Sequence, residues 1–341
     1  MANRILRSKS KNLVIPDVAS VKLETVKTVK PRARKAKTID DEAKIPITIK
    51  KVKPLPVELF EGELDYFRAA GPLSSELPPV FVKTHDVECI KALGAVLAKD
   101  PTLFPTVISQ NFSVFQIADI ELANQRRDDD NAYFEKLADG ILSQQVSGKA
   151  AESIKRKLTF TLTGVEPQPG KQFSTPDAKT VLDATFETLR GCGLSTRKAE
   201  YMQGLAAMFV SGELSASYFN SASDEEISKK LISIRGIGPW SVTMFMIFQL
   251  RRLDYFDIRD LGVLRGGSRY LLDRPTLFEE VKSKHVLAKR TAHLINKKNV
   301  KWTAVDEGYV EFVAAQFAPY RSILMFLFWR LSGVNINVLE S

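Results

Sequence analysis

A glycine-rich turn lies in the middle of the most informative stretch, Leu231-Ile232-Ser233-Ile234-Arg235-Gly236-Ile237-Gly238-Pro239-Trp240-Ser241-Val242. The residues before the turn predict the end of one helix, and Pro239 suits the first turn of the next, where its missing N–H is not needed. Gly236 and Gly238 permit positive φ and carry no side chains. Backbone N–H groups near Ser241 can then approach a phosphate. On its own, such a turn is more often a plain connection between two helices.

Helical periodicity runs through most of the chain after Val57. One apolar face predicts a helix that ends near Asp100-Pro101, with Leu93, Val96 and Leu97 on that face. A second amphipathic helix begins after Asp130, and its apolar positions are Phe134, Leu137, Ala138, Ile141 and Leu142.

Capping residues predict where several later helices begin. Thr175 with Pro176 predicts a helix that runs towards Arg190. Ser195 predicts the start of a helix with a buried stripe of Ala199, Met202, Leu205, Ala206 and Phe209. Ser223 and Glu226 have capping-box spacing, before a helix that continues to Arg235. A buried helix is expected from Trp240 to Gln249. No alternating strand pattern appears after residue 130, so the fold class is all-α or nearly so.

The positive charge of the chain is concentrated in its first part. The net charge is +9, yet 15 Lys or Arg stand against 5 Asp or Glu up to Lys53, and the remainder carries 34 against 35. Residues 1–55 lack a sustained apolar period and predict a disordered basic arm. Its cluster from Lys30 to Lys37 suits a nuclear address, an electrostatic DNA tether or a solubilising tail, and the acid-free, Arg-containing start also allows a mitochondrial address.

Composition excludes several classes of protein. Two cysteines, Cys89 and Cys192, are too few for a disulfide framework or a four-thiolate iron–sulfur cluster. The three histidines do not complete a metal-ligand pattern with them, so we expect no metal and no cofactor. The longest apolar runs are too short for a membrane span and no signal peptide opens the chain, which predicts a soluble intracellular protein with no membrane partner.

Beyond the turn, the sequence resembles the helix-hairpin-helix DNA glycosylase superfamily. Members place a glycine-rich hairpin about twenty residues before an essential aspartate that is followed by a Leu-Gly or similar pair. Here Asp260-Leu261-Gly262 matches, 22 positions after Gly238. The resemblance implies that Asp260 is the catalytic acid, although an aspartate at this position is also typical of an ordinary helix N-cap.

Three further segments carry the same resemblance, which covers roughly residues 80–335. Residues 141–151 contain Ser143-Gln144-Gln145 and resemble the segment that presents side chains to the DNA minor groove. Residues 193–199 resemble the loop and helix that follow. Residues 318–322, with Trp329-Arg330, resemble the C-terminal helix of the branch that removes alkylated bases. The resemblance implies two helical lobes with a cleft between them, residues 133–252 in one and residues 75–132 with 253–335 in the other, and Asp260 at a helix start lining the cleft.

The branch is suggested by one substitution. Bifunctional members carry a lysine nucleophile where this chain has Trp240, so no Schiff base can form there and water is the expected nucleophile. The resemblance therefore implies a monofunctional enzyme that releases 3-methyladenine and 7-methylguanine from double-stranded DNA. It does so by hydrolysing the N-glycosidic bond, most simply as a monomer. Such purines are already cationic, and a carboxylate beside the positive sugar stabilises its formation.

Other residues are candidates for binding. Trp240, with Met244 one turn later, is the candidate base pocket, through cation–π attraction, or else Trp240 only packs between helices. Gln144 and Gln145 either fill the gap left by a flipped nucleotide or form an ordinary helix end. The cationic side chains that could reach phosphates, or be only surface charges, are Lys149, Arg197 and Lys198.

Two residues beside Asp260 depart from the family pattern, and two rival functions remain. Arg259 stands where many relatives carry an additional acid, and Asp257 where they carry proline, so the charge and loop shape beside Asp260 differ. The rival functions are a noncatalytic helix-hairpin-helix DNA-binding protein and a bifunctional glycosylase for oxidised bases.

Overall fold

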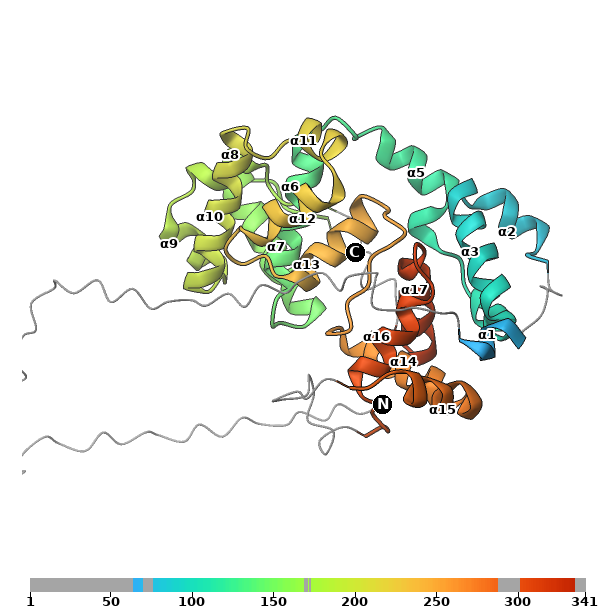
Figure 1. Cartoon of the computed structure of the whole chain (residues 1–341). Coiled ribbons are helices and arrows are strands. Elements are labelled where there is room, and N and C mark those ends of the chain that lie inside the picture. The colour runs from blue at the N-terminus through green and yellow to red at the C-terminus, as the bar shows by residue number, and fades with distance from the viewer. Residues whose placement is uncertain (1–63, 70–75, 169–170, 172, 288–300, 335–341) are drawn as a thin grey trace, which may run out of the picture. The chain divides into compact units, whose positions relative to one another are not determined.

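The computed structural model describes residues 64–69, 76–168, 171, 173–287 and 301–334 (Figure 1). Within this part of the chain there are helices and no strand, and only an isolated bridge joins His85 to Gln116. The first helices are α1 (Asp65–Ala69), α2 (Pro79–Thr84), α3 (Val87–Lys99), η2 (Pro101–Leu103), α4 (Phe104–Ile108), η3 (Ser113–Phe115) and α5 (Ile117–Asn124). The all-α fold class is therefore confirmed. The predicted arm, residues 1–55, lies outside the described residues.

The helices of the middle of the chain surround one hydrophobic core. They are α6 (Asp130–Ser143), α7 (Gly148–Thr163), α8 (Ala178–Asp183), α9 (Phe186–Gly191), α10 (Thr196–Val210), α11 (Ala216–Ser221), α12 (Asp224–Ile232) and α13 (Pro239–Met244). The buried residues of this core run from Tyr133 to Met246. Tyr133 stacks on Phe219 with ring centroids 5.0 Å apart, which joins α6 to α11.

A second core combines the first helices with the last ones. The last helices are α14 (Leu261–Leu272), α15 (Pro275–Lys284), α16 (Glu307–Ala315) and α17 (Arg321–Ser332). This core contains Leu93 and Leu97 of α3 together with the consecutive buried residues Ile323 to Trp329 of α17. Ile247 of the π-helical turn η4 (Phe245–Gln249) also belongs to it, although the residues just before Ile247 belong to the other core. The chain thus folds as two helical lobes.

Most predicted helix starts are confirmed by side-chain caps. Ser195 accepts a hydrogen bond from the Lys198 backbone N–H, and Ser223 forms the full capping box with Glu226. All five residues of the predicted stripe on α10 are buried. Pro239 occupies the first turn of α13. The helix expected to reach Arg235 ends three residues earlier, at Ile232, because the hairpin begins there.

The helix predicted to start at Thr175 and Pro176 was wrong. Two short helices, α8 and α9, occupy this region, and their caps are Asp177 and Thr185. The Thr175 hydroxyl instead donates to Asp139 Oδ1 at 2.6 Å, and its N–H donates to Glu135 at 3.3 Å. These two acids lie on α6, so a tertiary contact overrides the local capping pattern.

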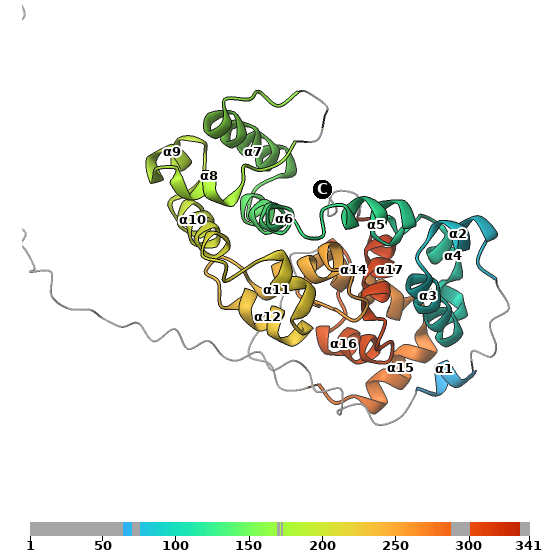
Figure 2. The same cartoon turned by 90° about the horizontal axis from the view of Figure 1, so that it is seen from above.

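Glycines allow α14 and α17 to pack very closely (Figure 2). A Cβ placed on Gly266 would lie 1.9 Å from the Phe328 carbonyl oxygen, and one on Gly267 would lie 2.3 Å from a Val310 methyl. A side chain at Gly266 would therefore force the two helix backbones apart. The close packing on α17 fixes the position of the first turn of α14.

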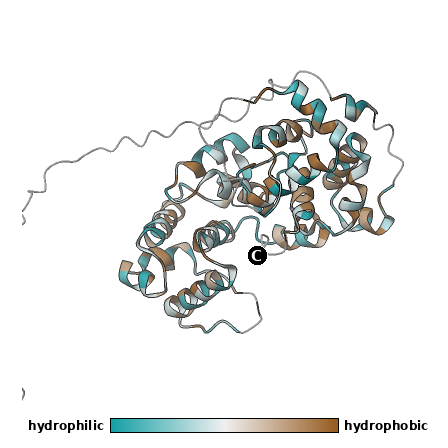
Figure 3. Cartoon of the chain, turned by 90° about the horizontal axis from the view of Figure 1, so that it is seen from below, coloured by the Kyte–Doolittle hydropathy of each residue, from teal (hydrophilic) through white to brown (hydrophobic). Residues whose placement is uncertain are grey.

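Several helices that cover the two cores, α7 and α14 among them, are amphipathic. In Figure 3 individual helices carry both apolar and polar residues, as helices that cover a core do. Among the described residues, none of the helices is both long enough and apolar enough to cross a bilayer.

Candidate active site and nucleic-acid interface

Asp260 is the N-cap of α14, so it lies at a helix start. Its Oδ1 accepts a hydrogen bond from the Val263 backbone N–H at 2.9 Å, and its own N–H donates to the Asp257 carbonyl at 3.2 Å. The prediction that Asp260 is a helix N-cap is therefore confirmed. The other contacts of its carboxylate do not belong to helix capping.

Two indole groups donate to the Asp260 carboxylate, one from a residue before it in the sequence and one from a residue after it. Trp240 Nε1 donates to Oδ2 at 2.9 Å, and Trp329 Nε1 donates to Oδ1 at 3.0 Å. Together with the Val263 N–H, every described partner is a donor. An ionised carboxylate only accepts hydrogen bonds, so this arrangement suits the anion.

Trp329 is fixed in place by its surroundings. It is completely buried, stacks on Phe248 with ring centroids 5.8 Å apart, and meets Phe326 edge-on at 5.3 Å. A Cβ on Gly262 would lie 2.9 Å from Trp329 Cδ1. The glycine of the Asp260-Leu261-Gly262 sequence therefore leaves the space through which the indole reaches the acid.

The contact between Trp329 and Asp260 was not predicted from the sequence. The two residues are 69 positions apart, and Trp329 was noted only as part of a resemblance of the C-terminal helix. An apolar helix that contains a single tryptophan gives one usable signal, because a buried indole N–H needs an acceptor.

Trp240 differs from Trp329 in its exposure. Its side chain is 38% exposed, so it is not simply packed between helices, and its N–H is directed at Asp260. Met244, one turn later on α13, is half-buried and packs against the core of the other lobe. Of the two predicted pocket residues, only Trp240 contacts the acid in this structure.

The two hairpin glycines have different physical roles. Gly236 has φ +93°, and a Cβ there would lie 2.3 Å from the Tyr201 ring, so both the backbone and the space require glycine. Gly238 has φ −98°, so of the two hairpin glycines only Gly236 adopts the positive φ that glycine permits. A Cβ on Gly238 would meet no atom within 4 Å. Its lack of a side chain leaves open the approach to the start of α13, where Ser241 lies half-buried.

The predicted minor-groove segment lies against the hairpin. Gln144 is half-buried, and its Nε2 donates to the Gly236 carbonyl at 2.7 Å. Gln145 is exposed and has φ +57°, an uncommon value for a residue with a side chain. The two glutamines, which are equivalent candidates in the sequence, therefore differ in burial and in hydrogen bonding.

The three predicted phosphate-binding cations also differ. Lys198 Nζ donates to the Leu142 carbonyl at 2.6 Å, at the end of α6, and partial burial lowers the pKa of this amine. It acts as a helix C-terminal cap in this structure. Lys149 and Arg197 are exposed.

Asp257 and Arg259, the two departures from the family pattern, contact each other. Arg259 Nε donates to Asp257 Oδ1 at 2.7 Å, and its Nη2 donates to Oδ2 at 2.9 Å. The Asp257 carboxylate is almost fully buried, while the Arg259 side chain is 37% exposed. The basic and acidic substitutions therefore neutralise each other directly beside Asp260.

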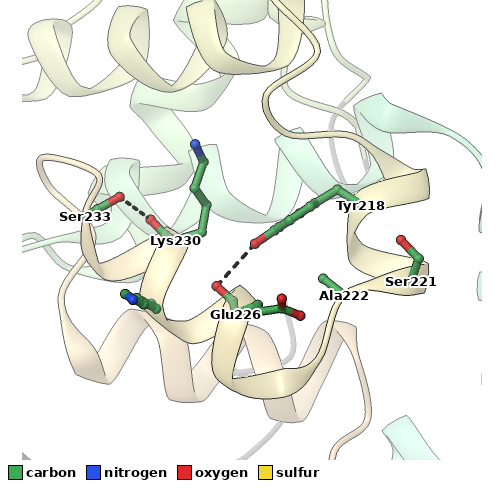
Figure 4. A pocket seen from close by; sticks show the side chains of 7 residues that line it. Tyr218, Ser221, Ala222, Glu226, Lys230 and Ser233 are labelled. Carbon is green, nitrogen blue, oxygen red and sulfur yellow. Dashed lines mark hydrogen bonds between the residues drawn. The ribbon is translucent and has the colours of Figure 1, made fainter.

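A hollow on the described surface lies away from Asp260. A groove of about 610 Å³ between α11 and α12 is lined by Tyr218, Ser221, Ala222, Glu226, Lys229, Lys230 and Ser233, and the Tyr218 hydroxyl donates to the Glu226 carbonyl at 3.2 Å (Figure 4). Neither Asp260 nor either indole lines it, so the predicted cleft at Asp260 stays a prediction.

Comparisons with known proteins identify the family of this chain. Residues 138–297 match the model of the HhH-GPD superfamily of base excision DNA repair proteins. The DNA-3-methyladenine glycosylase of Saccharomyces cerevisiae is 35% identical over 271 residues, which cover 79% of this chain and 88% of that protein. DNA-3-methyladenine glycosylase 1 of Schizosaccharomyces pombe is 35% identical over 146 residues, 42% of this chain and 60% of that protein.

Among solved structures, a Schizosaccharomyces pombe 3-methyladenine DNA glycosylase in complex with abasic DNA is similar at 27% identity and a TM-score of 0.41, covering 58% of this chain and 79% of that one. The family assignment rests on the sequence matches, since the yeast relative is aligned over most of its length. This chain belongs to the HhH-GPD superfamily of base excision DNA repair proteins.

Proposed function

We propose that this chain is a monofunctional DNA glycosylase that removes alkylated purines from double-stranded DNA by hydrolysing the N-glycosidic bond. The carrying observation is the Asp260 carboxylate, which three N–H donors hold at the start of α14. The identity to DNA-3-methyladenine glycosylases supports the substrate class. Trp240 at the position of the lysine nucleophile supports the monofunctional reaction.

The chemistry follows from the charge of the substrate. When the bond between C1′ and the base nitrogen breaks, its electron pair leaves with the cationic purine, which becomes neutral, and positive charge develops on the deoxyribose. A fixed carboxylate beside that charge lowers the barrier. Water then adds to C1′ and loses a proton, and the Asp260 carboxylate orients this water or accepts the proton.

The two indoles have separate parts in this proposal. Both keep the carboxylate oriented, so that little reorganisation is needed as the sugar becomes positive. Trp240, being partly exposed, also offers its ring face to a cationic base. The hairpin around Gly236 and Gly238 holds a phosphate of the damaged strand, with Lys149 and Arg197 as further contacts.

An Asp260→Asn variant tests the catalytic role. The amide keeps the size of the side chain but removes its charge, so we expect release of 3-methyladenine from methylated duplex DNA to fall by about 100-fold or more. Binding of undamaged duplex should survive, because the hairpin is unchanged. Near-normal release by the variant would reject the assignment.

Two further observations separate the rival functions. A noncatalytic binder would release no free 3-methyladenine from methylated duplex, even as the unaltered protein. A bifunctional enzyme would form a covalent DNA adduct that borohydride traps, whereas we expect no adduct here because Trp240 cannot form a Schiff base.

A further inference from the structure

The last turn of α6 and the short segment that joins α6 to α7 are each tied to a neighbouring element. Lys198 of α10 donates to the Leu142 carbonyl at 2.6 Å, and the Gln144 side chain donates to the Gly236 carbonyl at 2.7 Å. The second contact joins residues 92 positions apart. It is the direct link between the hairpin and the segment predicted to enter the minor groove.

The acceptor of this link has a well-defined position. Gly236 has positive φ and packs against the Tyr201 ring, which lies on α10 in the same lobe. Because its carbonyl is fixed by that packing, a side chain bonded to it is fixed as well. Gln144 thus transmits the position of the hairpin to the next residue along the chain.

The next residue, Gln145, is held in an unusual conformation. It is exposed and has φ +57°, a region where a side chain contacts its own backbone unfavourably. Such conformations persist when the surrounding structure determines them. Here Gln144 is bonded on one side, and Ser147 on the other caps α7 by accepting from the Ala150 N–H.

We infer that Gln144 is a positioning residue: its bond to Gly236 sets the distance between the phosphate-binding hairpin and Gln145, the neighbouring candidate for the space left by a flipped nucleotide. The inference rests on the proposed function, since it assigns parts within the same DNA interface. A Gln144 amide that is bonded to Gly236 cannot also fill the gap in the duplex. The two glutamines therefore have different tasks.

Fluorescence of a base analogue tests this division. The probe is a methylated duplex with 2-aminopurine beside the target nucleotide, and all proteins carry Asp260→Asn so that the base stays attached. We expect Gln144→Ala to reduce the flipping signal by about 3- to 10-fold, the effect of one lost hydrogen bond on an equilibrium. Affinity for undamaged duplex and the melting temperature should stay close to those of the Asp260→Asn protein.

Gln203→Ala is the matched control. Gln203 is another half-buried glutamine of this lobe, and its Nε2 donates to the Ala184 carbonyl at 2.9 Å, outside the hairpin. Its replacement should leave the flipping signal unchanged. An equal loss with both variants would show a general effect on the lobe and would overturn the inference.

A double-mutant cycle separates positioning from direct contact. If Gln144 acts only through Gln145, then Gln144→Ala adds no further loss to Gln145→Ala. Additive losses would show that Gln144 contacts DNA independently, which contradicts the inference but leaves the proposed function intact. Absence of any flipping signal with the Asp260→Asn parent would instead contradict the proposed function itself.

Discussion

The Asp260 carboxylate depends on donors from three separate places in the sequence. The Val263 N–H is local, Trp240 follows the hairpin, and Trp329 belongs to the last helix. Each charge-assisted hydrogen bond of this kind contributes roughly 1.5–3 kcal/mol. The orientation of the acid is therefore a property of residues that no local sequence pattern connects.

Replacing Trp329 by phenylalanine should impair catalysis more than folding. The variant keeps an aromatic ring against Phe248 but removes the indole N–H, and we expect the single-turnover rate of base release to fall by about 10- to 100-fold. Trp302→Phe is the control, because Trp302 packs on the same core without a described bond to Asp260. Equal rates for both variants would mean that the N–H is unimportant.

The family resemblance predicted from the sequence that Asp260 begins a helix, and it does. The sequence could not show that Gln144 bonds to Gly236, or that Arg259 pairs with Asp257, because those contacts depend on side-chain directions in the folded chain.

Among the elements, α14 and α17 form the closest contact around the site. Gly262 faces Trp329, and Gly266 faces the Phe328 backbone, one turn further along the same side of α14. The two glycines set how near the first turn of α14 lies to the indole. Gly262 belongs to the Asp260-Leu261-Gly262 motif, and its closeness to Trp329 is the physical reason for a glycine at this position.

A Gly262→Ala substitution should disturb this arrangement. The added Cβ would lie 2.8 Å from a Val334 methyl, 2.9 Å from Trp329 Cδ1 and 3.1 Å from Asp260 Oδ1, so the indole or the helix must move. We expect a loss of about 1–3 kcal/mol in the free energy of unfolding and a slower release of base. Denaturant unfolding and single-turnover kinetics measure the two effects.

Gly204→Ala is the matched control for that prediction. Gly204 lies within α10, and a Cβ there meets no atom within 4 Å. The alanine should therefore raise the free energy of unfolding by about 0.4–1 kcal/mol. If both variants changed stability in the same direction, the close approach at Gly262 would not be the cause.

Element boundaries were predictable wherever the capping side chain bonded locally. Ser195 and Ser223 are such cases. Thr175 is the opposite case, because its hydroxyl donates to Asp139, which is 36 positions away. A threonine before a proline has the same local pattern in both situations, so the sequence alone could not distinguish them.

The basic arm and the helical part of the chain are expected to have separate roles. The positive charge is concentrated up to Lys53, whereas Asp260 and its three donors lie in the helical part of the chain. The proposed roles of the arm, a nuclear or mitochondrial address and an electrostatic tether, do not involve the chemistry at Asp260.

Deleting residues 1–55 should therefore leave hydrolysis of a short methylated duplex nearly unchanged. It should make the dependence of DNA affinity on salt less steep, because fewer counterions are released. Titrations at several salt concentrations measure the slope, and a full-length chain with Lys30, Arg32, Arg34, Lys35 and Lys37 changed to Gln is the control for charge. Loss of the chemical step on truncation would show that the arm belongs to the catalytic fold.

The contact of Trp240 with Asp260 has a consequence for how the enzyme fails. One donor to the acid comes from the hairpin lobe, and the other indole comes from the lobe that carries the acid itself. Partial opening of the joint between the lobes would misalign the carboxylate while each lobe stayed folded. Heat inactivation would then follow the opening of this joint and not global unfolding. A heated molecule would therefore lose base release before its helices unfold.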